Sequence, residues 1–180
     1  MKERVGNLMT GKEGRGLTVS TFHNLGLNII RKEVDALGYK PGFSIFDSQD
    51  VLALLKDLTH KEFEAAEDAC EPIQHLISNW KNDLISPARA MAGANGPEQA
   101  LAARVYESYQ KTLKLYNGVD FDDLILQPVE LFKARPDILE KWQNKVRYLL
   151  VDEYQDTNSS QYLLVKQLVG HRSNFTVVGD

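Results

Sequence analysis

Two adjacent carboxylates follow a short apolar run near the end of the chain. Asp152 and Glu153 come directly after the apolar residues 148–151. An apolar parallel strand that ends in acids places carboxylates at the carboxyl edge of a sheet, where ligands bind in α/β proteins. Mg²⁺ prefers oxygen ligands, and hydrolysis needs a base beside the attacking water. Asp152 could therefore hold a metal while Glu153 orients or deprotonates the nucleophile. Acids also solvate turns at strand ends, so both interpretations stay open here.

A near match to a phosphate-binding loop lies at residues 6–13, with the sequence GNLMTGKE. The pattern G-x-x-x-x-G-K-[ST] ends in a hydroxyl that reaches Mg²⁺. Glu13 instead adds a negative charge beside the phosphates, and residues 1–5 are charged rather than a buried strand. We interpret this segment as a glycine-containing surface loop. The 180 residues hold no other match to the pattern.

Three strand-length segments rich in apolar and β-branched residues lie at 17–22, 148–151 and 175–178. The last two are separated by a stretch with the length of a crossover helix, which predicts a βαβ unit with parallel strands covered on both faces. Asn158 is suited to cap that helix, because Gln161 stands three residues later and can reach back.

Three apolar stripes with helical spacing lie between the first strand and the second. They are Ile73, Ile77, Trp80 and Leu84; Leu101, Val105, Tyr109 and Leu113; and Phe121, Leu124, Ile125, Val129 and Phe132. Pro128 should kink or divide the third helix, because proline lacks an amide proton. The pattern predicts an α/β fold, mostly helical overall, with a partial parallel sheet of about three strands. Residues 1–34 and 118–180 would form this domain, and 35–117 an inserted helical subdomain.

Two further groups of residues have simple structural interpretations. Asp120, Asp122 and Asp123 have the composition of a metal cluster, but acids at a helix start explain them more simply, with Asp120 as the cap. Phe22 is compatible with a core position at a strand end, and His23 with a solvated or capping residue.

Composition limits the partners and the compartment. There are 21 Lys and Arg against 25 Asp and Glu, for a net charge of −4, so any nucleic-acid contact must be local. The first forty residues carry a positive balance. The lone Cys70 excludes an internal disulfide, and no apolar run approaches the roughly 18 residues of a membrane span. We expect a soluble cytoplasmic protein without membrane contact.

Four segments in order resemble motifs of one family. Residues 152–158, with the sequence DEYQDTN, resemble the second motif of superfamily-one DNA helicases of the Rep/UvrD type. Residues 21–23 are similar to that family's motif at single-stranded DNA, and 120–124 to the motif that precedes the acidic strand. Residues 177–180 resemble the opening of its third motif. The resemblance covers essentially the whole chain.

The resemblance implies a fragment of a RecA-like motor domain with its helical insertion. Its parent would be an ATP-dependent helicase that couples Mg²⁺-ATP hydrolysis to 3′ to 5′ translocation on single-stranded DNA and to unwinding in replication or repair. Asp152 would bind Mg²⁺ and, with Glu153, would belong to the ATP site. The catalytic residues implied are Glu153 and Gln155, and the DNA-binding residues implied are Thr21, Phe22 and His23.

The chain also departs from the family's pattern. The family's phosphate loop and adenine-contacting glutamine are absent from these 180 residues, so we expect no ATP hydrolysis by this polypeptide alone. Single-stranded DNA, duplex junctions and replication or repair proteins would be partners of the parent. The alternative is a non-catalytic helical module that retains a motor remnant and docks a protein partner.

Overall fold

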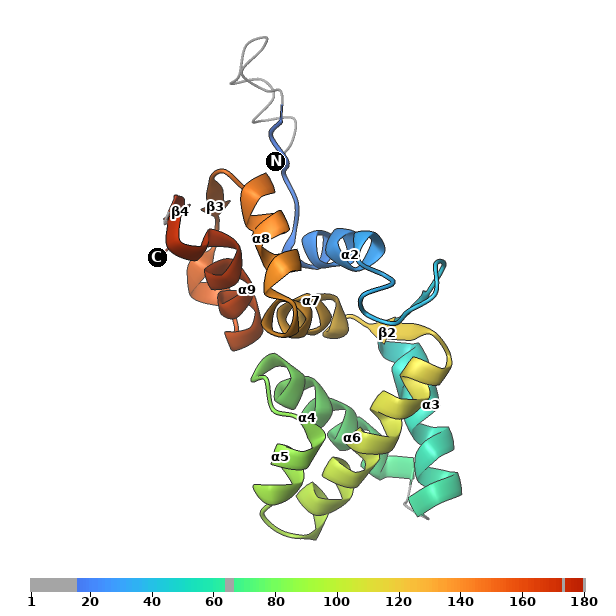
Figure 1. Ribbon diagram of the computed structural model, residues 1–180. Helices are drawn as coiled ribbons and strands as arrows, with labels where there is room; N and C mark the ends of the chain where they lie inside the picture. Colours follow the sequence, from blue (N-terminus) through green and yellow to red (C-terminus); the bar gives the residue numbers. More distant parts are fainter. Residues whose placement is uncertain (1–15, 64–66, 173, 180) are drawn as a thin grey trace.

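The computed structural model describes residues 16–63, 67–172 and 174–179. It is mostly helical and forms two bodies, which Figure 1 shows one above the other. We call 48–115 the helical body: α3 (Ser48–Leu58), α4 (Cys70–Asn82), α5 (Pro87–Ala92) and α6 (Pro97–Leu115). The mixed body contains α2 (Phe22–Lys32), α7 (Asp123–Ala134), α8 (Pro136–Lys145), β3 (Leu149–Val151), α9 (Ser159–Val169) and β4 (Phe175–Val177).

Short elements complete the chain. Strands β1 (Ser44–Phe46) and β2 (Gly118–Asp120) pair in parallel where the chain enters and leaves the helical body. A π-helical turn spans Thr59–Phe63, and 3₁₀ turns span Glu67–Ala69, Tyr154–Asp156 and Gly170–Arg172. The near match to a phosphate loop at 6–13 lies outside the described residues.

The helical body is built on the apolar stripes of its helices. Ile73 and Ile77 of α4 pack in one buried cluster with Val105, Tyr109 and Leu113 of α6, as the spacing predicts. Side-chain caps fix where helices begin: Asp47 caps α3 in a capping box, and Ser86 caps α5 before a proline. A second cluster holds the mixed body together, with α7 packed against α2, α8 and α9.

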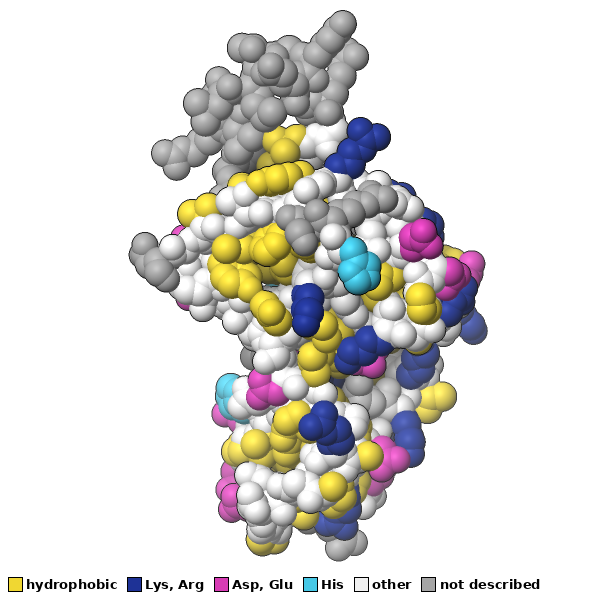
Figure 2. Space-filling model, turned by 60° about the vertical axis from the view of Figure 1, so that its left-hand side comes forward, with side chains coloured by type: hydrophobic (Ala, Val, Ile, Leu, Met, Phe, Trp, Pro, Cys, Tyr) yellow, Lys and Arg dark blue, Asp and Glu magenta, His cyan; other side chains and the backbone are white. Residues whose placement is uncertain are grey.

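The predicted βαβ unit is confirmed. β3 and β4 pair in parallel with α9 between them in sequence. The Asn158 side chain accepts from the backbone N–H of Gln161 at 2.9 Å, and Gln161 reaches back to the N–H of Asn158, which forms the capping box. The strands are less covered than we predicted: Leu150 is 65% exposed and Phe175 44%. Figure 2 shows hydrophobic side chains gathered on the half of the molecule that carries these strands.

Two predictions about strands are wrong. Residues 17–21 form no strand, and helix α2 begins at Phe22. Thr21 caps this helix because its hydroxyl accepts from the N–H of Asn24 at 3.2 Å, so local capping outweighs the β-branched composition. In place of the predicted single sheet of about three strands, the described residues form two separate two-stranded parallel sheets. Strands β1 and β2 are too short to produce a sequence pattern.

Helix α7 runs through Pro128 without dividing, so the division that we predicted as the alternative to a kink does not occur. Pro128 has no N–H to donate to the carbonyl of Leu124, four residues earlier. The backbone of Gly26 in α2 packs against that carbonyl, since a Cβ on Gly26 would lie 1.7 Å from the Leu124 oxygen. The carbonyl that Pro128 leaves without its helical donor therefore lies at the crossing of α2 and α7.

Gly26→Ala is expected to destabilise the protein by about 1 to 3 kcal/mol, because α2 must move away from α7 to admit the methyl group. The same change in an open helix would stabilise by up to about 1 kcal/mol. Urea denaturation measures the difference. Gly93→Ala is the control, since a Cβ there would lie 3.4 Å from the nearest described atom, the Arg89 oxygen. A stabilised Gly26→Ala protein would contradict the close crossing.

None of the described helices is long and apolar enough to cross a membrane.

Candidate functional site

The acidic loop, residues 152–157, lies at the carboxyl ends of the parallel strands β3 and β4. Val178 donates its N–H to the carbonyl of Val151 at 2.8 Å, and Tyr154 donates to the carbonyl of Val178 at 3.0 Å. These bonds hold the residues after both strands together, where ligands bind in parallel sheets. The structure therefore places the predicted loop and residues 177–179, which resemble the opening of the third motif, side by side.

Glu153 has a left-handed backbone, with φ 52° and ψ 44°. This conformation costs a non-glycine residue on the order of 1 kcal/mol and is concentrated at functional sites. The loop compensates with local hydrogen bonds: the N–H of Glu153 donates to Oδ1 of Asp152 at 3.0 Å, and the carbonyl of Glu153 accepts from the N–H of Asp156 at 3.0 Å. The side chains of Asp152 and Glu153 are consequently exposed and adjacent.

Gln155 connects the acidic pair to the end of β4. Its Nε2 donates to Oε2 of Glu153 at 2.7 Å. A Cβ on Gly179 would lie 2.1 Å from Oε1 of Gln155, so the Gln155 side chain would have to move to admit one. The structure brings together Asp152, Glu153 and Gln155.

The donor set of the loop fits Mg²⁺ bound together with phosphates. Mg²⁺ is commonly held by one or two carboxylates, with substrate oxygens and waters completing its shell. Asp152 supplies such a carboxylate, and Glu153 a second one beside it. Within the described residues, no three acidic, histidine or cysteine side chains converge on a closed metal site. The loop is therefore suited to a metal that arrives with a ligand.

The three residues at the start of α2 form a separate group. Thr21 is exposed and caps the helix, while Phe22 and His23 are half-buried. Phe22 packs against the buried cluster of the mixed body. No hydrogen bond or ion pair joins these three residues to the acidic loop in the part of the chain that the structure describes.

Asp120 and Asp123 belong to a buried network rather than a metal cluster. Nζ of Lys81 donates to Oδ2 of Asp120 at 2.6 Å and to Oδ1 of Asp123 at 3.0 Å. The Tyr109 hydroxyl donates to Oδ2 of Asp120 at 2.6 Å. The Asp120 side chain accepts from the backbone N–H of Asp123, and the Asp123 side chain accepts from the backbone N–H of Asp120. The capping interaction that we predicted for Asp120 is therefore present, although Asp122 is the residue directly before α7.

Charge and burial in this network shift the pKa values of Asp120 and Asp123 in opposite directions. Burial alone would raise the pKa of Asp120, but the Lys81 charge and hydrogen bonds from Lys81, Tyr109 and Asp123 lower it below its usual value. Burial raises the pKa of Asp123 to about 6, because the Lys81 charge only partly opposes it. The charges of both carboxylates raise the pKa of Lys81 against the effect of its burial, so this lysine stays charged.

Lys81 was not identified from the sequence, although a signal exists. Lys81 stands eight residues after Ile73 and four after Ile77, which places it on the buried face of α4. A charged residue in an apolar stripe predicts a buried partner, because an unpaired buried charge is very costly. The partners come from 39 and 42 residues further along the chain, so spacing alone does not identify them.

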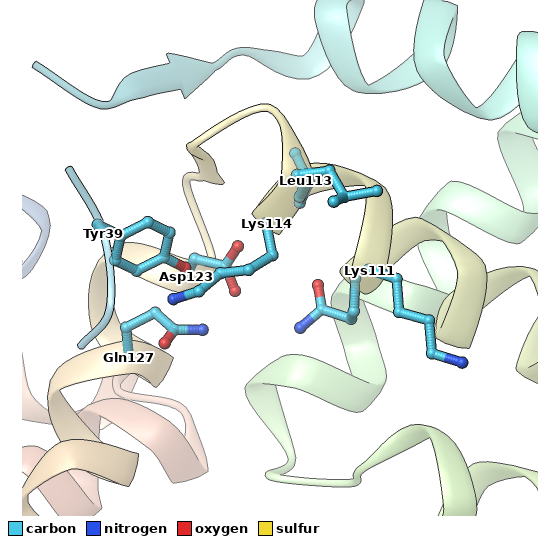
Figure 3. Close-up of a pocket in the computed structure, with 8 residues that line it drawn as sticks. Tyr39, Lys111, Leu113, Lys114, Asp123 and Gln127 are labelled. Carbon is cyan, nitrogen blue, oxygen red and sulfur yellow. The ribbon is translucent and has the colours of Figure 1, made fainter.

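A pocket of about 620 Å³ opens beside this network. In Figure 3, the polar ends of Tyr39, Lys114, Asp123 and Gln127 point toward one another, and Lys111 extends away. Nζ of Lys114 donates to the carbonyl of Leu37 at 2.5 Å and lies 3.5 Å from the centre of the Tyr39 ring. The pocket is thus part of the junction between the two bodies. Lys114, which lines it, already contacts Leu37 and Tyr39.

Comparison with known proteins identifies the class. The sequence model of the UvrD/REP helicase N-terminal domain matches residues 1–180, so the chain belongs to this family.

Individual relatives are similar along the whole chain. The chain is 55% identical over 180 residues to the ATP-dependent DNA helicase Rep of Salmonella typhimurium and 54% identical to that of Escherichia coli. It is 41% identical over 182 residues to the ATP-dependent DNA helicase PcrA of Staphylococcus aureus. All of this chain is covered in each case, but only 27%, 27% and 25% of the relatives' length.

Proposed function

We propose that the chain is part of the first RecA-like motor domain of an ATP-dependent DNA helicase that moves 3′ to 5′ on single-stranded DNA. The observation that carries this proposal is the exposed pair Asp152–Glu153 at the carboxyl edge of parallel strands, in a member of the UvrD/REP family. The partly exposed faces of β3 and β4 favour helices packed against them in the full-length protein.

Each residue of the acidic loop has a role in this proposal. Asp152 would hold Mg²⁺, directly or through water, and the bound metal would supply positive charge beside the phosphates. Glu153 orients the attacking water and accepts its proton. Gln155 positions the Glu153 carboxylate through the 2.7 Å hydrogen bond from its Nε2. The left-handed backbone turns the two carboxylates outward, toward a ligand at the sheet edge.

Two of the three buried clusters in the described residues bear on the division of the chain. We propose that 35–117 is the inserted subdomain and that 1–34 with 118–180 belong to the motor domain. The separate apolar clusters of the helical and mixed bodies support this division. The insertion would leave and rejoin the motor domain through the adjacent strands β1 and β2.

ATP hydrolysis tests the proposal directly. The full-length protein should hydrolyse ATP with Mg²⁺ and accelerate when single-stranded DNA is added. The 180-residue polypeptide should show no turnover with or without DNA, because it contains no phosphate loop to hold the triphosphate. Full-length protein that docks a protein partner but never hydrolyses ATP would instead favour the non-catalytic interaction module.

Phe22→Ala tests the DNA contact that we propose for Thr21, Phe22 and His23. If the ring stacks on a base, affinity for single-stranded DNA should fall by about 1 to 3 kcal/mol, and the loss should persist at raised salt. Leu25→Ala is the control, since Leu25 packs against the same cluster. Equal effects of both substitutions on melting temperature, with unchanged DNA binding, would assign Phe22 to packing alone.

A further inference from the structure

Two lysines from different helices lie over one tryptophan ring. Nζ of Lys32, the last residue of α2, is 5.6 Å from the centre of the Trp142 ring. Nζ of Lys145, the last residue of α8, is 4.7 Å from it. The ring is only 3% exposed, and its Nε1 donates to Oε1 of the buried Glu33 at 2.9 Å. Trp142 therefore serves as a fixed support for two cations and offers no open face on which a base could stack.

The carboxylates beside these lysines are already engaged. Glu33 forms an ion pair with Lys141, in addition to its hydrogen bond from the ring. Asp137 of α8 accepts two hydrogen bonds from the arginine two residues before it. Lys32 and Lys145, which we call the cation pair, are exposed and form no ion pair with any residue in the ranges that the structure describes. The cation pair is thus an exposed positive site without an anion of its own.

Two like charges held beside one ring favour an anion. A cation over an aromatic ring at an exposed site gains about 0.5 to 1 kcal/mol, but two neighbouring ammonium groups also repel each other. An anion that contacts both would relieve the repulsion and gain two charge-assisted hydrogen bonds. A phosphodiester suits this arrangement, because each of its two free oxygens can accept from one ammonium group.

Helix α2 connects the cation pair to the proposed DNA residues. It begins at Phe22 and ends at Lys32, over 11 residues. At a rise of 1.5 Å per residue the helix is about 16 Å long, which roughly five nucleotides of a stacked strand span at 3.4 Å each. A strand that contacts Thr21, Phe22 and His23 can therefore extend to the cation pair. The net charge of −4 requires any such contact to be local, and the cation pair meets that condition.

We propose that Lys32 and Lys145 form a second DNA contact, which binds the backbone phosphates of a strand roughly five nucleotides beyond the start of α2. The inference rests on the proposed function and extends the DNA path past Thr21, Phe22 and His23. The contact carries no sequence preference, because ammonium groups at phosphates do not distinguish the bases.

The salt dependence of single-stranded DNA binding by the full-length protein tests the contact. Lys32→Gln and Lys145→Gln should each reduce the slope of log affinity against log salt concentration by about 0.7, because each removes one phosphate contact. The affinity should fall equally for oligonucleotides of different sequence. Lys133→Gln is the matched control, since Lys133 lies on α7 of the same body and is paired with Glu130 at 3.1 Å. It should leave the slope unchanged.

Lysine acetylation measures the contact without any substitution. With single-stranded DNA bound, Lys32 and Lys145 should react more slowly with a small acetylating reagent, because a phosphate covers their ammonium groups. Lys133 should react at the rate of the free protein. Mass spectrometry of the peptides from the full-length protein gives the rate at each lysine.

Three outcomes would contradict these proposals, each in a different way. Unchanged slopes and unprotected lysines, beside DNA binding that Phe22→Ala weakens, would overturn the second contact and leave the proposed function intact. Protection of Lys32 and Lys145 by polyglutamate but not by DNA would overturn it in favour of an acidic protein partner. Absence of DNA binding by the unsubstituted full-length protein would instead contradict the proposed function.

Discussion

Glu153→Gln in the full-length protein is expected to lower DNA-stimulated ATP hydrolysis by about 10²- to 10⁴-fold, the usual contribution of a general base. Glutamine has the shape of glutamate and can still accept from Nε2 of Gln155, so the loop should keep its conformation. It cannot take a proton from water. ATP binding should remain nearly unchanged, because the metal ligand that we propose, Asp152, is retained. Steady-state turnover and equilibrium binding of ATP measure the two effects separately.

Glu140→Gln provides the control, since Glu140 is an exposed glutamate on α8. It removes the same charge outside the acidic loop and should leave turnover unchanged. If Glu153→Gln abolished ATP binding as well, Glu153 would shape the site instead of acting as its base. If it left turnover intact, the base would have to be another residue.

Local sequence signals predicted the acidic loop and the helix after it. The apolar run 148–151 and the Asn158–Gln161 pair depend on neighbours in sequence, and the structure confirms both the strand and the capping box. Helices α4 and α6 of the helical body were predicted for the same reason, since each stripe repeats within one segment. The left-handed backbone of Glu153 has no such signal, because it depends on bonds to Asp152 and Asp156.

Features that depend on distant residues were missed or wrong. The segment 17–22 has strand composition, but no neighbouring strand pairs with it and Thr21 caps a helix instead. Pro128 leaves the Leu124 carbonyl without its helical donor, and the backbone of Gly26, in another helix, packs against that carbonyl. Asp120 and Asp123 were assigned to a helix start, and their buried lysine partner was missed because it lies 39 and 42 residues away.

Lys81→Met is expected to cost about 3 to 5 kcal/mol of folding free energy at neutral pH, because it leaves two buried carboxylates without their cation. Lys111→Met is the control. Lys111 pairs with Glu107 on the surface, where both side chains are more than 60% exposed, and it should cost less than about 1 kcal/mol. Lys81→Met combined with Asp123→Asn should recover part of the loss, since it removes one unpaired charge.

The pH dependence of this loss identifies its cause. Asp123 already has a pKa of about 6 against an ordinary 3.8, so the folded state binds more protons than the unfolded state between these values. Its contribution to stability therefore falls as pH rises through this window. Without Lys81 the paired carboxylates should retain a proton to still higher pH. Urea denaturation should thus show a smaller loss at pH 5 than at pH 8. A loss independent of pH would mean that Lys81 stabilises the junction through packing of its alkyl chain instead of its charge.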